Sequence, residues 1–370
     1  MKIIIIGTAF PFRGGIASFN ERLAEEFIAM GHEVVIFTFT LQYPNFLFPG
    51  KTQYSDDPKP THLKIVPILN SVNPFNWIIS GLKIRKEKAD IIISKFWIPF
   101  MGPSLGTVIR LAKTKNTKAI SIIDNIIPHE KRIGDKILSG YFVGAIDRFI
   151  VMSLSVKEDM KSFTSTKPII YKPHPIYDNY GDILTSDQAR EYLKLDKSGK
   201  YVMFFGFIRD YKGLDLLLEA MADKKVGDAG IKCIVAGEYY GNKEKYDKII
   251  QELGIKDRLV LRTDFISNEE VRYYFCAADL VVQPYITATQ SGISQIAYHF
   301  EKPMIVTDVG GLPEIVEHGK AGYVVKPKSE EISKSILDFF EGNKISNFEE
   351  AVKRKKKEFS WRNFVQKILE

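Results

Sequence analysis

Short apolar runs rich in β-branched residues alternate with helical patterns along the whole chain. Runs of this kind are typical of strands buried on both faces of a parallel sheet that helices cover. The predicted strands of the first half are 3–6, 33–39, 91–93, 119–123 and 149–152. After a polar stretch that ends at Lys200 the pattern starts again, with strands predicted at 201–205, 232–236, 258–261, 280–283 and 304–307. The pattern predicts two doubly wound α/β halves joined near residues 171–185.

The length supports this division. A chain of 370 residues exceeds what one hydrophobic core usually organises, so two domains of roughly 150 to 200 residues are expected. We place the first domain at 1–172, with a C-terminal segment 355–370, and the second at 173–354. In open parallel sheets ligands bind beyond the carboxyl ends of the strands, so two facing halves would form an interdomain cleft.

The composition is that of an ordinary globular chain, with 45% hydrophobic and 26% charged residues, which excludes an extended or disordered protein. The net charge of +7 fits a phosphate-bearing ligand or an anionic membrane surface. The cations are dispersed and no aromatic-basic recognition motif occurs, so nucleic acid is not an expected partner. Both cysteines, Cys233 and Cys276, lie in apolar runs, which indicates a reducing compartment and a cytoplasmic location.

No segment is predicted to be a signal peptide or to cross a membrane as a helix. The apolar start Ile3–Ile6 is too short for the core of a signal peptide and reads as a buried strand. The uncharged stretch 96–109 is broken by prolines and glycines and falls far short of the roughly 20 residues that a spanning helix needs.

The first strand leads into a glycine pair, Gly14 and Gly15, that opens a helix with apolar residues at helical spacing. Exposed amides at a helix start suit an anion such as a diphosphate, or a sugar hydroxyl. A plain strand-to-helix turn explains the same glycines equally well. The spacing is not the dinucleotide fingerprint G-x-G-x-x-G, so a nicotinamide or flavin cofactor is not predicted.

The first strand of the second half runs into a loop from Gly206 to Gly213 that carries Arg209 and Lys212. Two cations three residues apart can neutralise a diphosphate leaving group as its charge develops. The alternative is ordinary solvated surface charge.

Hydroxyl and amide side chains surround a glycine after the strand 280–283. They suit hydrogen bonds to sugar hydroxyls, and the amides of the following helix start suit a phosphate. The donor-binding candidates in this stretch are Thr289, Gln290, Ser291, Gly292 and Gln295. A helix capped by Thr289 or Ser291 is the compatible structural explanation.

These loops, taken with Gly310-Gly311-Leu312-Pro313-Glu314 and Gly322-Tyr323-Val324-Val325, resemble glycosyltransferase family 4. The resemblance spans nearly the whole chain and is strongest over 201–330. It implies the GT-B architecture of two facing Rossmann-like domains, with a C-terminal helix that crosses back to the first. It also implies metal-independent, retaining transfer of a hexose-type sugar from a UDP- or GDP-linked donor, with no further cofactor, to a glycan or lipid-linked acceptor in cell-surface polysaccharide synthesis.

The sequence departs from this family at its two usual glutamates, where Ala288 and Ile296 stand. By the resemblance Gln295 becomes the ribose partner, and Thr289 or Gln290 would hold the sugar. The family's diphosphate arginine is replaced by Phe207, so Arg209 is expected to substitute for it.

In the first half, residues 122–130 resemble a family segment in which a histidine faces the donor sugar. Asp124 occupies that position and could accept a hydrogen bond from a sugar hydroxyl or the acceptor proton. His129 and Glu130 are acceptor-side candidates, although a histidine after proline is often structural. No aspartate is followed two positions later by another, and H-E-x-x-H does not occur in the sequence, so no metal site is predicted. A nucleotide-sugar epimerase, a glycan phosphorylase or a catalytically silent GT-B protein is the alternative.

Aromatic side chains concentrate in the first half near a basic cluster formed by Lys83, Arg85, Lys86 and Lys88, which includes a single acidic residue, Glu87. The aromatic residues are Phe46, Phe48, Phe75, Trp77, Phe96, Trp97 and Phe100. Rings and cations placed together suit the surface of an anionic membrane, whereas rings packed in the core would be the structural explanation. The proline-started segment 74–82 has the pattern of an interfacial helix, which favours peripheral membrane association.

Overall fold

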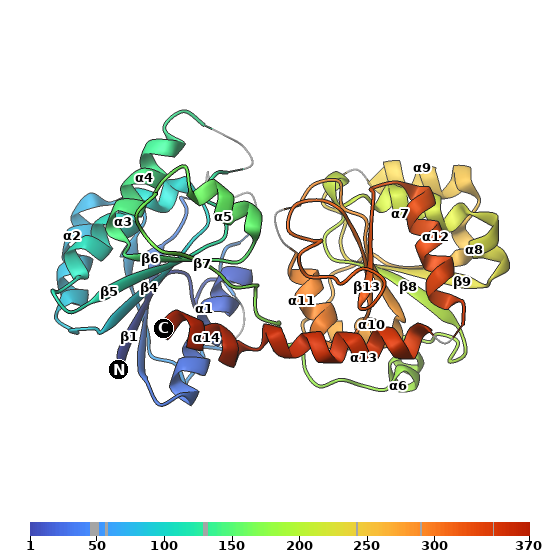
Figure 1. The fold of residues 1–370 in the computed structure, drawn as a ribbon, viewed down its shortest axis with the longest axis horizontal. Coiled ribbons are helices and arrows are strands. Elements are labelled where there is room, and N and C mark those ends of the chain that lie inside the picture. Colours follow the sequence, from blue (N-terminus) through green and yellow to red (C-terminus); the bar gives the residue numbers. More distant parts are fainter. Residues whose placement is uncertain (45–51, 56–57, 129–131, 242, 289–290, 343) are drawn as a thin grey trace. The chain divides into compact units, whose positions relative to one another are not determined.

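The computed structural model describes residues 1–44, 52–55, 58–128, 132–241, 243–288, 291–342 and 344–370. It divides into two compact units, each with its own parallel sheet (Figure 1). Unit 1 consists of Met1–Pro173 and Trp361–Glu370, and unit 2 of His174–Ser360.

Unit 1 is built on a seven-stranded parallel sheet with the order β3-β2-β1-β4-β5-β6-β7. Its strands are β1 (Lys2–Ile6), β2 (Glu33–Leu41), β3 (Ile65–Asn70), β4 (Ile91–Phe96), β5 (Lys118–Ile123), β6 (Arg148–Val151) and β7 (Ile169–Tyr171). Its helices are α1 (Gly15–Ala29), α2 (Pro74–Arg85), α3 (Gly102–Ala112), α4 (Asp135–Ala145), α5 (Leu154–Met160) and α14 (Trp361–Leu369).

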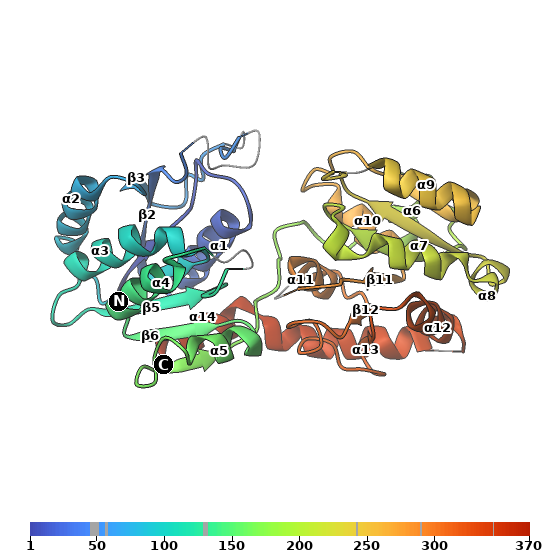
Figure 2. The same ribbon diagram turned by 90° about the horizontal axis from the view of Figure 1, so that it is seen from above.

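Helices cover both faces of this sheet. Alternate residues of β1, Ile4 and Ile6, belong to a buried cluster with side chains of α2, α3 and α4. On the other face α1 packs against α14 through Phe19, whose ring lies 5.0 Å from that of Trp361. Figure 2 shows α2, α3 and α4 as one layer.

Unit 2 has a six-stranded parallel sheet with the order β10-β9-β8-β11-β12-β13. Its strands are β8 (Lys200–Phe205), β9 (Ile231–Ala236), β10 (Leu259–Arg262), β11 (Leu280–Gln283), β12 (Met304–Thr307) and β13 (Gly322–Val325). Its helices are α6 (Ser186–Tyr192), α7 (Leu214–Ala222), α8 (Lys224–Asp228), α9 (Lys243–Leu253), α10 (Val271–Ala277), α11 (Gly292–His299), α12 (Ser329–Phe340) and α13 (Lys344–Lys356). Helices α7, α9 and α12 contribute to one buried cluster, and α6, α10 and α11 to another.

The predicted fold class is confirmed, since every predicted strand is present and both sheets are parallel. The C-terminal helix α14 belongs to unit 1, as the resemblance implies. The apolar pattern does not predict β3, β7 or β13, all of which lie at sheet edges. An edge strand pairs on one side only, so it tolerates Pro67 within β3 and can be as short as β7.

Candidate functional site

The candidate residues of unit 2 lie at the switch point of its sheet. Strand β8 has β9 on one side and β11 on the other, so the connections from β8 and from β11 leave the sheet in opposite directions. The loops that follow β8 and β11 flank the crevice that such a reversal creates, which is where open α/β sheets bind ligands. Arg209 and Lys212 follow β8, and Ser291 and Gly292 follow β11.

Two glycines fix the course of the loop after β8. Gly206 has φ 101° and Gly213 has φ 65°, both in the region that favours glycine. A Cβ on Gly213 would lie 2.0 Å from the carbonyl oxygen of Pro284, so only glycine lets this loop lie directly against the loop that follows β11.

Lys212 is held in the crevice by this close approach. A Cβ on Gly206 would lie 3.1 Å from the Lys212 Nζ atom, which therefore sits over that glycine. The same Nζ lies 5.7 Å from the centre of the Tyr285 ring. Burial, reinforced by the charge of Arg209, lowers the pKa of Lys212 to about 8. The structure thus keeps a cation where the surroundings disfavour charge.

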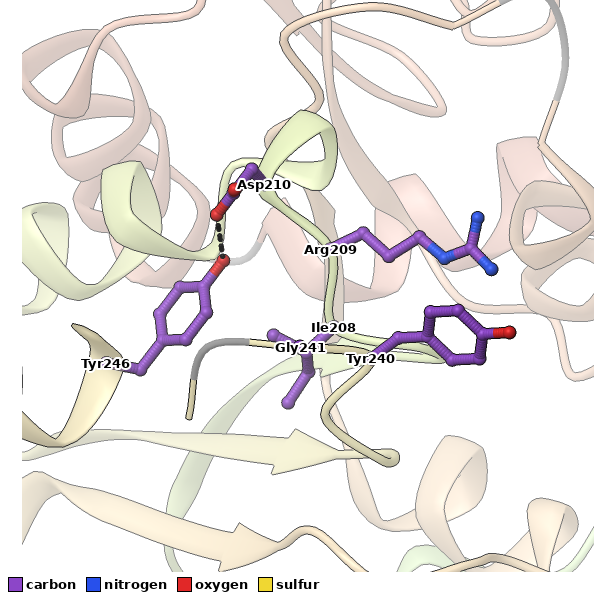
Figure 3. Close-up of a pocket in the computed structure, with 6 residues that line it drawn as sticks. All are labelled: Ile208, Arg209, Asp210, Tyr240, Gly241 and Tyr246. Atoms are coloured by element: carbon purple, nitrogen blue, oxygen red, sulfur yellow. Dashed lines mark hydrogen bonds between the residues drawn. The ribbon is translucent and has the colours of Figure 1, made fainter. Parts of the chain in front are cut away.

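Arg209 of the same loop lines a cavity of about 260 Å³ (Figure 3). Its guanidinium carbon lies 4.1 Å from the centre of the Tyr240 ring, a cation–π contact. Ile208, Asp210, Gly241 and Tyr246 complete the lining of this cavity. The stacked ring orients the guanidinium without neutralising it.

The carboxylates closest in sequence to these cations are engaged elsewhere. Lys245 Nζ lies 3.0 Å from an Asp210 oxygen and 3.2 Å from an Asp215 oxygen. The Tyr246 hydroxyl donates a further hydrogen bond to Asp210 at 3.3 Å. Among the described residues Arg209 and Lys212 therefore have no ion-pair partner, which leaves both charges available to an anion. Lys245, which neutralises the loop's own carboxylates, is not found by the sequence analysis because it comes from the start of α9.

Helix α11 begins beside Lys212. Its N-cap residue Ser291 makes no side-chain bond to the helix, and its hydroxyl instead lies 3.3 Å from that of Tyr285. The Ile293 side chain approaches Gly206, so the helix start adjoins the place where Lys212 Nζ lies. Exposed Gly292 and its neighbours offer backbone amides with no capping side chain among the described residues. Thr289 and Gln290 lie outside the described residues.

Gln295, the expected ribose partner, is almost completely buried. Its exposed fraction is 2%, and its Oε1 atom has no hydrogen-bond partner among the described residues. Ile296, which stands at a usual glutamate position, is also buried. A buried amide oxygen without a partner is costly, so Gln295 retains unused hydrogen-bonding capacity.

In unit 1 the glycine pair also lies at a switch point, between β1 and β4. Gly14 is the N-cap of α1 with φ 104°, and both glycines are exposed. A Cβ on Gly14 would meet no atom of the described residues within 4 Å, so these residues leave space in front of this helix start.

Asp124 follows β5 and is paired with a lysine that the sequence analysis does not single out. Lys95 Nζ lies 2.9 Å from an Asp124 oxygen, with exposed side-chain fractions of 4% and 21%. Burial lowers the pKa of Lys95 and raises the pKa of Asp124, and their mutual attraction opposes both shifts. A lone lysine inside the apolar run 91–96 is itself a signal, because a buried charge requires a partner.

Helices α1 and α14 support this pair. Lys95 Nζ lies 3.5 Å from the centre of the Phe19 ring, and that ring packs against Trp361 at 5.0 Å and Phe364 at 5.9 Å. Asp124 is therefore oriented by a contact chain that ends at the C-terminal helix. His129 and Glu130 lie outside the described residues.

The aromatic set of the first half divides between core and surface. Phe96 is fully buried and stacks on Phe142 at 4.3 Å, so its expected place at a membrane interface is wrong. It belongs to the core because it ends β4, which has a neighbouring strand on each side. Phe75 is exposed, Trp77, Trp97 and Phe100 are half-buried, and Phe46 and Phe48 lie outside the described residues.

Within the described residues, no three His, Cys, Asp or Glu side chains form a group that could hold a metal ion. The described helices are likewise all too short or too polar to cross a membrane.

Comparison with known proteins points to one enzyme class. Residues 185–359 match the family model described as glycosyl transferases group 1. The chain is 24% identical to an uncharacterized glycosyltransferase of Methanocaldococcus jannaschii, covering 100% of this chain and 97% of that protein. It is 27% identical to D-inositol 3-phosphate glycosyltransferase of Mycolicibacterium smegmatis, covering 64% of this chain and 56% of that protein.

Solved structures share the fold. HepE of Anabaena, solved in complex with UDP, matches with a TM-score of 0.75 at 16% identity, covering 100% of this chain and 98% of that one. The lipopolysaccharide outer core galactosyltransferase WaaB matches with a TM-score of 0.69 at 14% identity, covering 99% and 100%. At these identities the likeness shows the architecture of two Rossmann-like units.

Proposed function

We propose that this chain, whose residues 185–359 match the family model described as glycosyl transferases group 1, transfers a hexose-type sugar from a nucleotide sugar to a glycan or lipid-linked acceptor. Unit 2 binds a UDP- or GDP-linked donor, and unit 1 binds the acceptor. The product is a cell-surface polysaccharide or its precursor, made in the cytoplasm.

One observation carries the proposal: Arg209 and Lys212 have no ion-pair partner among the described residues, and Lys212 lies beside the start of α11. A diphosphate supplies the two negative charges that these cations lack. As the bond to the sugar breaks, charge develops on the leaving diphosphate, and preorganised cations stabilise that charge without rearranging. The protein's own cations thus serve the leaving group, which favours transfer that needs no metal.

In unit 1 we assign Asp124 to the reacting sugar or the acceptor hydroxyl. Its carboxylate is held by Lys95 yet keeps part of its surface exposed, so it can accept a hydrogen bond while remaining oriented. Transfer proceeds with retention at the anomeric carbon. Gly14 and Gly15 bring backbone amides to the same edge of the sheet.

The test begins with a thermal-shift panel of UDP-, GDP- and ADP-sugars, because a ligand that binds only the folded protein raises its melting temperature. The best donor is then incubated with candidate acceptors, and proton NMR reads the anomeric configuration of the product. Transfer with retention supports the proposal. Conversion of the donor to an epimer, inversion, or no stabilisation by any nucleotide sugar would overturn it.

A further inference from the structure

Helix α2 of unit 1 turns its most apolar side outward. Phe75, Ile78, Ile79 and Leu82 follow the i, i+3, i+4, i+7 spacing of a single helix face. All four are exposed, with exposed fractions of 78% for Phe75 and 66% for Ile79. The buried residues of the helix are Ser80, Gly81 and Ile84, two of them small or polar. This is the reverse of an ordinary surface helix, which buries its apolar stripe.

Packing fixes this orientation. A Cβ on Gly81 would lie 2.6 Å from Leu111 Cβ, so only glycine lets α2 approach α3 this closely. The Ser80 hydroxyl donates to the carbonyl of Ile68 at 3.1 Å, and the Asn76 amide donates to the same carbonyl at 2.9 Å. Rotation of the helix to cover the apolar stripe would break these contacts.

The helix start is equally well defined. The Asn73 side chain accepts hydrogen bonds from the backbone amides of Phe75 and Asn76, and Pro74 occupies the first turn. The stripe therefore belongs to a capped, ordered helix.

The exposed charges around the stripe are positive, and the acidic residue that follows, half-buried Glu87, is ion-paired with Lys2 at 2.6 Å. Lys83 lies on one flank of the apolar face, Arg85 on the other, and Lys86 continues the stripe just beyond the helix end. Residues 74–86 contain no acidic residue. Helix α4, in the same layer, adds the exposed pair Lys136 and Ile137.

We propose that this α2 face is a docking surface for an anionic lipid bilayer, with the helix lying in the plane of the interface. Apolar side chains enter the boundary between headgroups and acyl chains, and the flanking cations face the anionic headgroups. A protein partner would have to match an apolar stripe bordered on both flanks by cations, a pattern for which the bilayer surface is the simplest complement. Docking would bring unit 1 to a lipid-linked acceptor, yet the inference does not require the proposed transfer reaction.

The experiment uses the full chain and sedimentation with vesicles of phosphatidylcholine containing 30% phosphatidylglycerol or none. Wild-type protein should bind the anionic vesicles, more weakly as salt rises. The variant Phe75→Ser/Ile79→Ser should bind anionic vesicles about tenfold more weakly or worse, because it removes two apolar side chains that the bilayer would bury. Lys83→Glu/Lys86→Glu should lose binding chiefly at low salt.

Ile28→Gln provides a matched control, because Ile28 is an exposed apolar residue of α1 on the opposite face of the sheet. It should bind vesicles as the wild type does. The substituted side chains are exposed, so melting temperatures should stay unchanged and confirm that each variant is folded. No nucleotide is present, so the result is independent of whether the donor assignment is right.

Three results would overturn the inference. Wild-type protein could fail to bind anionic vesicles at low salt. The stripe variant could bind as tightly as the Ile28→Gln control. Light scattering could show a dimer that Phe75→Ser/Ile79→Ser dissociates, in which case a second copy of the chain covers the stripe.

Discussion

Replacing Lys212 by methionine should stabilise the protein at neutral pH and abolish its affinity for a nucleoside diphosphate. Methionine keeps an unbranched side chain of similar length but carries no charge. Burial and the neighbouring Arg209 lower the pKa of Lys212 from 10.5 to about 8, so folding disfavours its charged form. If this cation serves binding, the same substitution should improve stability and remove function.

The structure sets the size of the effect. A pKa difference of one corresponds to about 1.4 kcal/mol, so the fall to about 8 gives an upper limit of about 3 kcal/mol. Because the Lys212 side chain is only half-buried, solvent screening reduces the expected gain to about 1–2 kcal/mol. For a unit of this size, that gain raises the melting temperature by about 2–8 °C.

The stability difference between the wild type and Lys212→Met should depend on pH. Below pH 8 Lys212 is protonated in both the folded and the unfolded protein. The wild type therefore bears the full free-energy cost of burying this charge. Between about pH 8 and 10.5 the folded protein releases this proton while the unfolded chain retains it. The unfolded state then binds more protons, so wild-type stability rises with pH relative to the variant. The difference between wild type and Lys212→Met should therefore shrink over this range.

The assay combines calorimetric melting at pH 7 and pH 10 with titration of UDP or of whichever nucleotide the thermal-shift panel selects. Lys224→Met on α8 is the control, because it removes an exposed lysine of the same unit. It should change neither the melting temperature nor nucleotide affinity appreciably. The reasoning fails if Lys212→Met melts at or below the wild-type temperature at pH 7, or binds the nucleotide as tightly.

Three further substitutions test other parts of the site. Arg209→Ala should lower the transfer rate about 10²-fold, the scale seen when one preorganised charge stabiliser is removed, and unchanged initial rates would count against its role. Asp124→Asn should keep nucleotide affinity by calorimetry while lowering turnover, because only the reacting end is altered; an equal loss of nucleotide affinity would contradict this. Gly213→Ala should lower the free energy of unfolding by more than about 1 kcal/mol, since its φ of 65° and the nearby Pro284 carbonyl both exclude a side chain; an unaltered denaturation midpoint would refute the steric argument.

The apolar pattern is sufficient to predict the central strands, because helices cover both faces of each sheet and these strands are therefore apolar on both faces. It misses three of the four edge strands, of which β3 contains Pro67 and β13 begins with Gly322, and it finds only β10. The same limit explains Phe96: an aromatic residue near a basic cluster has the composition of an interface, and only the sheet order places it in the core.

The candidate site was predictable where it depends on loop sequence and not where it depends on distant partners. The glycine-flanked loop with Arg209 and Lys212 can be identified from residue order alone. That its carboxylates are taken by Lys245 follows from the position of α9, which no local pattern specifies. Lys95 could have been found, because a single charge inside a buried strand must be paired.

In unit 1 the C-terminal helix α14 supports the Lys95–Asp124 pair, although it lies far from both residues in the sequence. Lys95 is almost excluded from water, so its charge depends on Asp124 and on the face of the Phe19 ring. The position of that ring depends in turn on Trp361 and Phe364 of α14. Loss of α14 would expose one side of Phe19 and loosen the cation that orients Asp124, although no residue of the helix belongs to the candidate site. The return of the C-terminal helix to unit 1 therefore contributes to the placement of a proposed reactive carboxylate as well as to the stability of the fold.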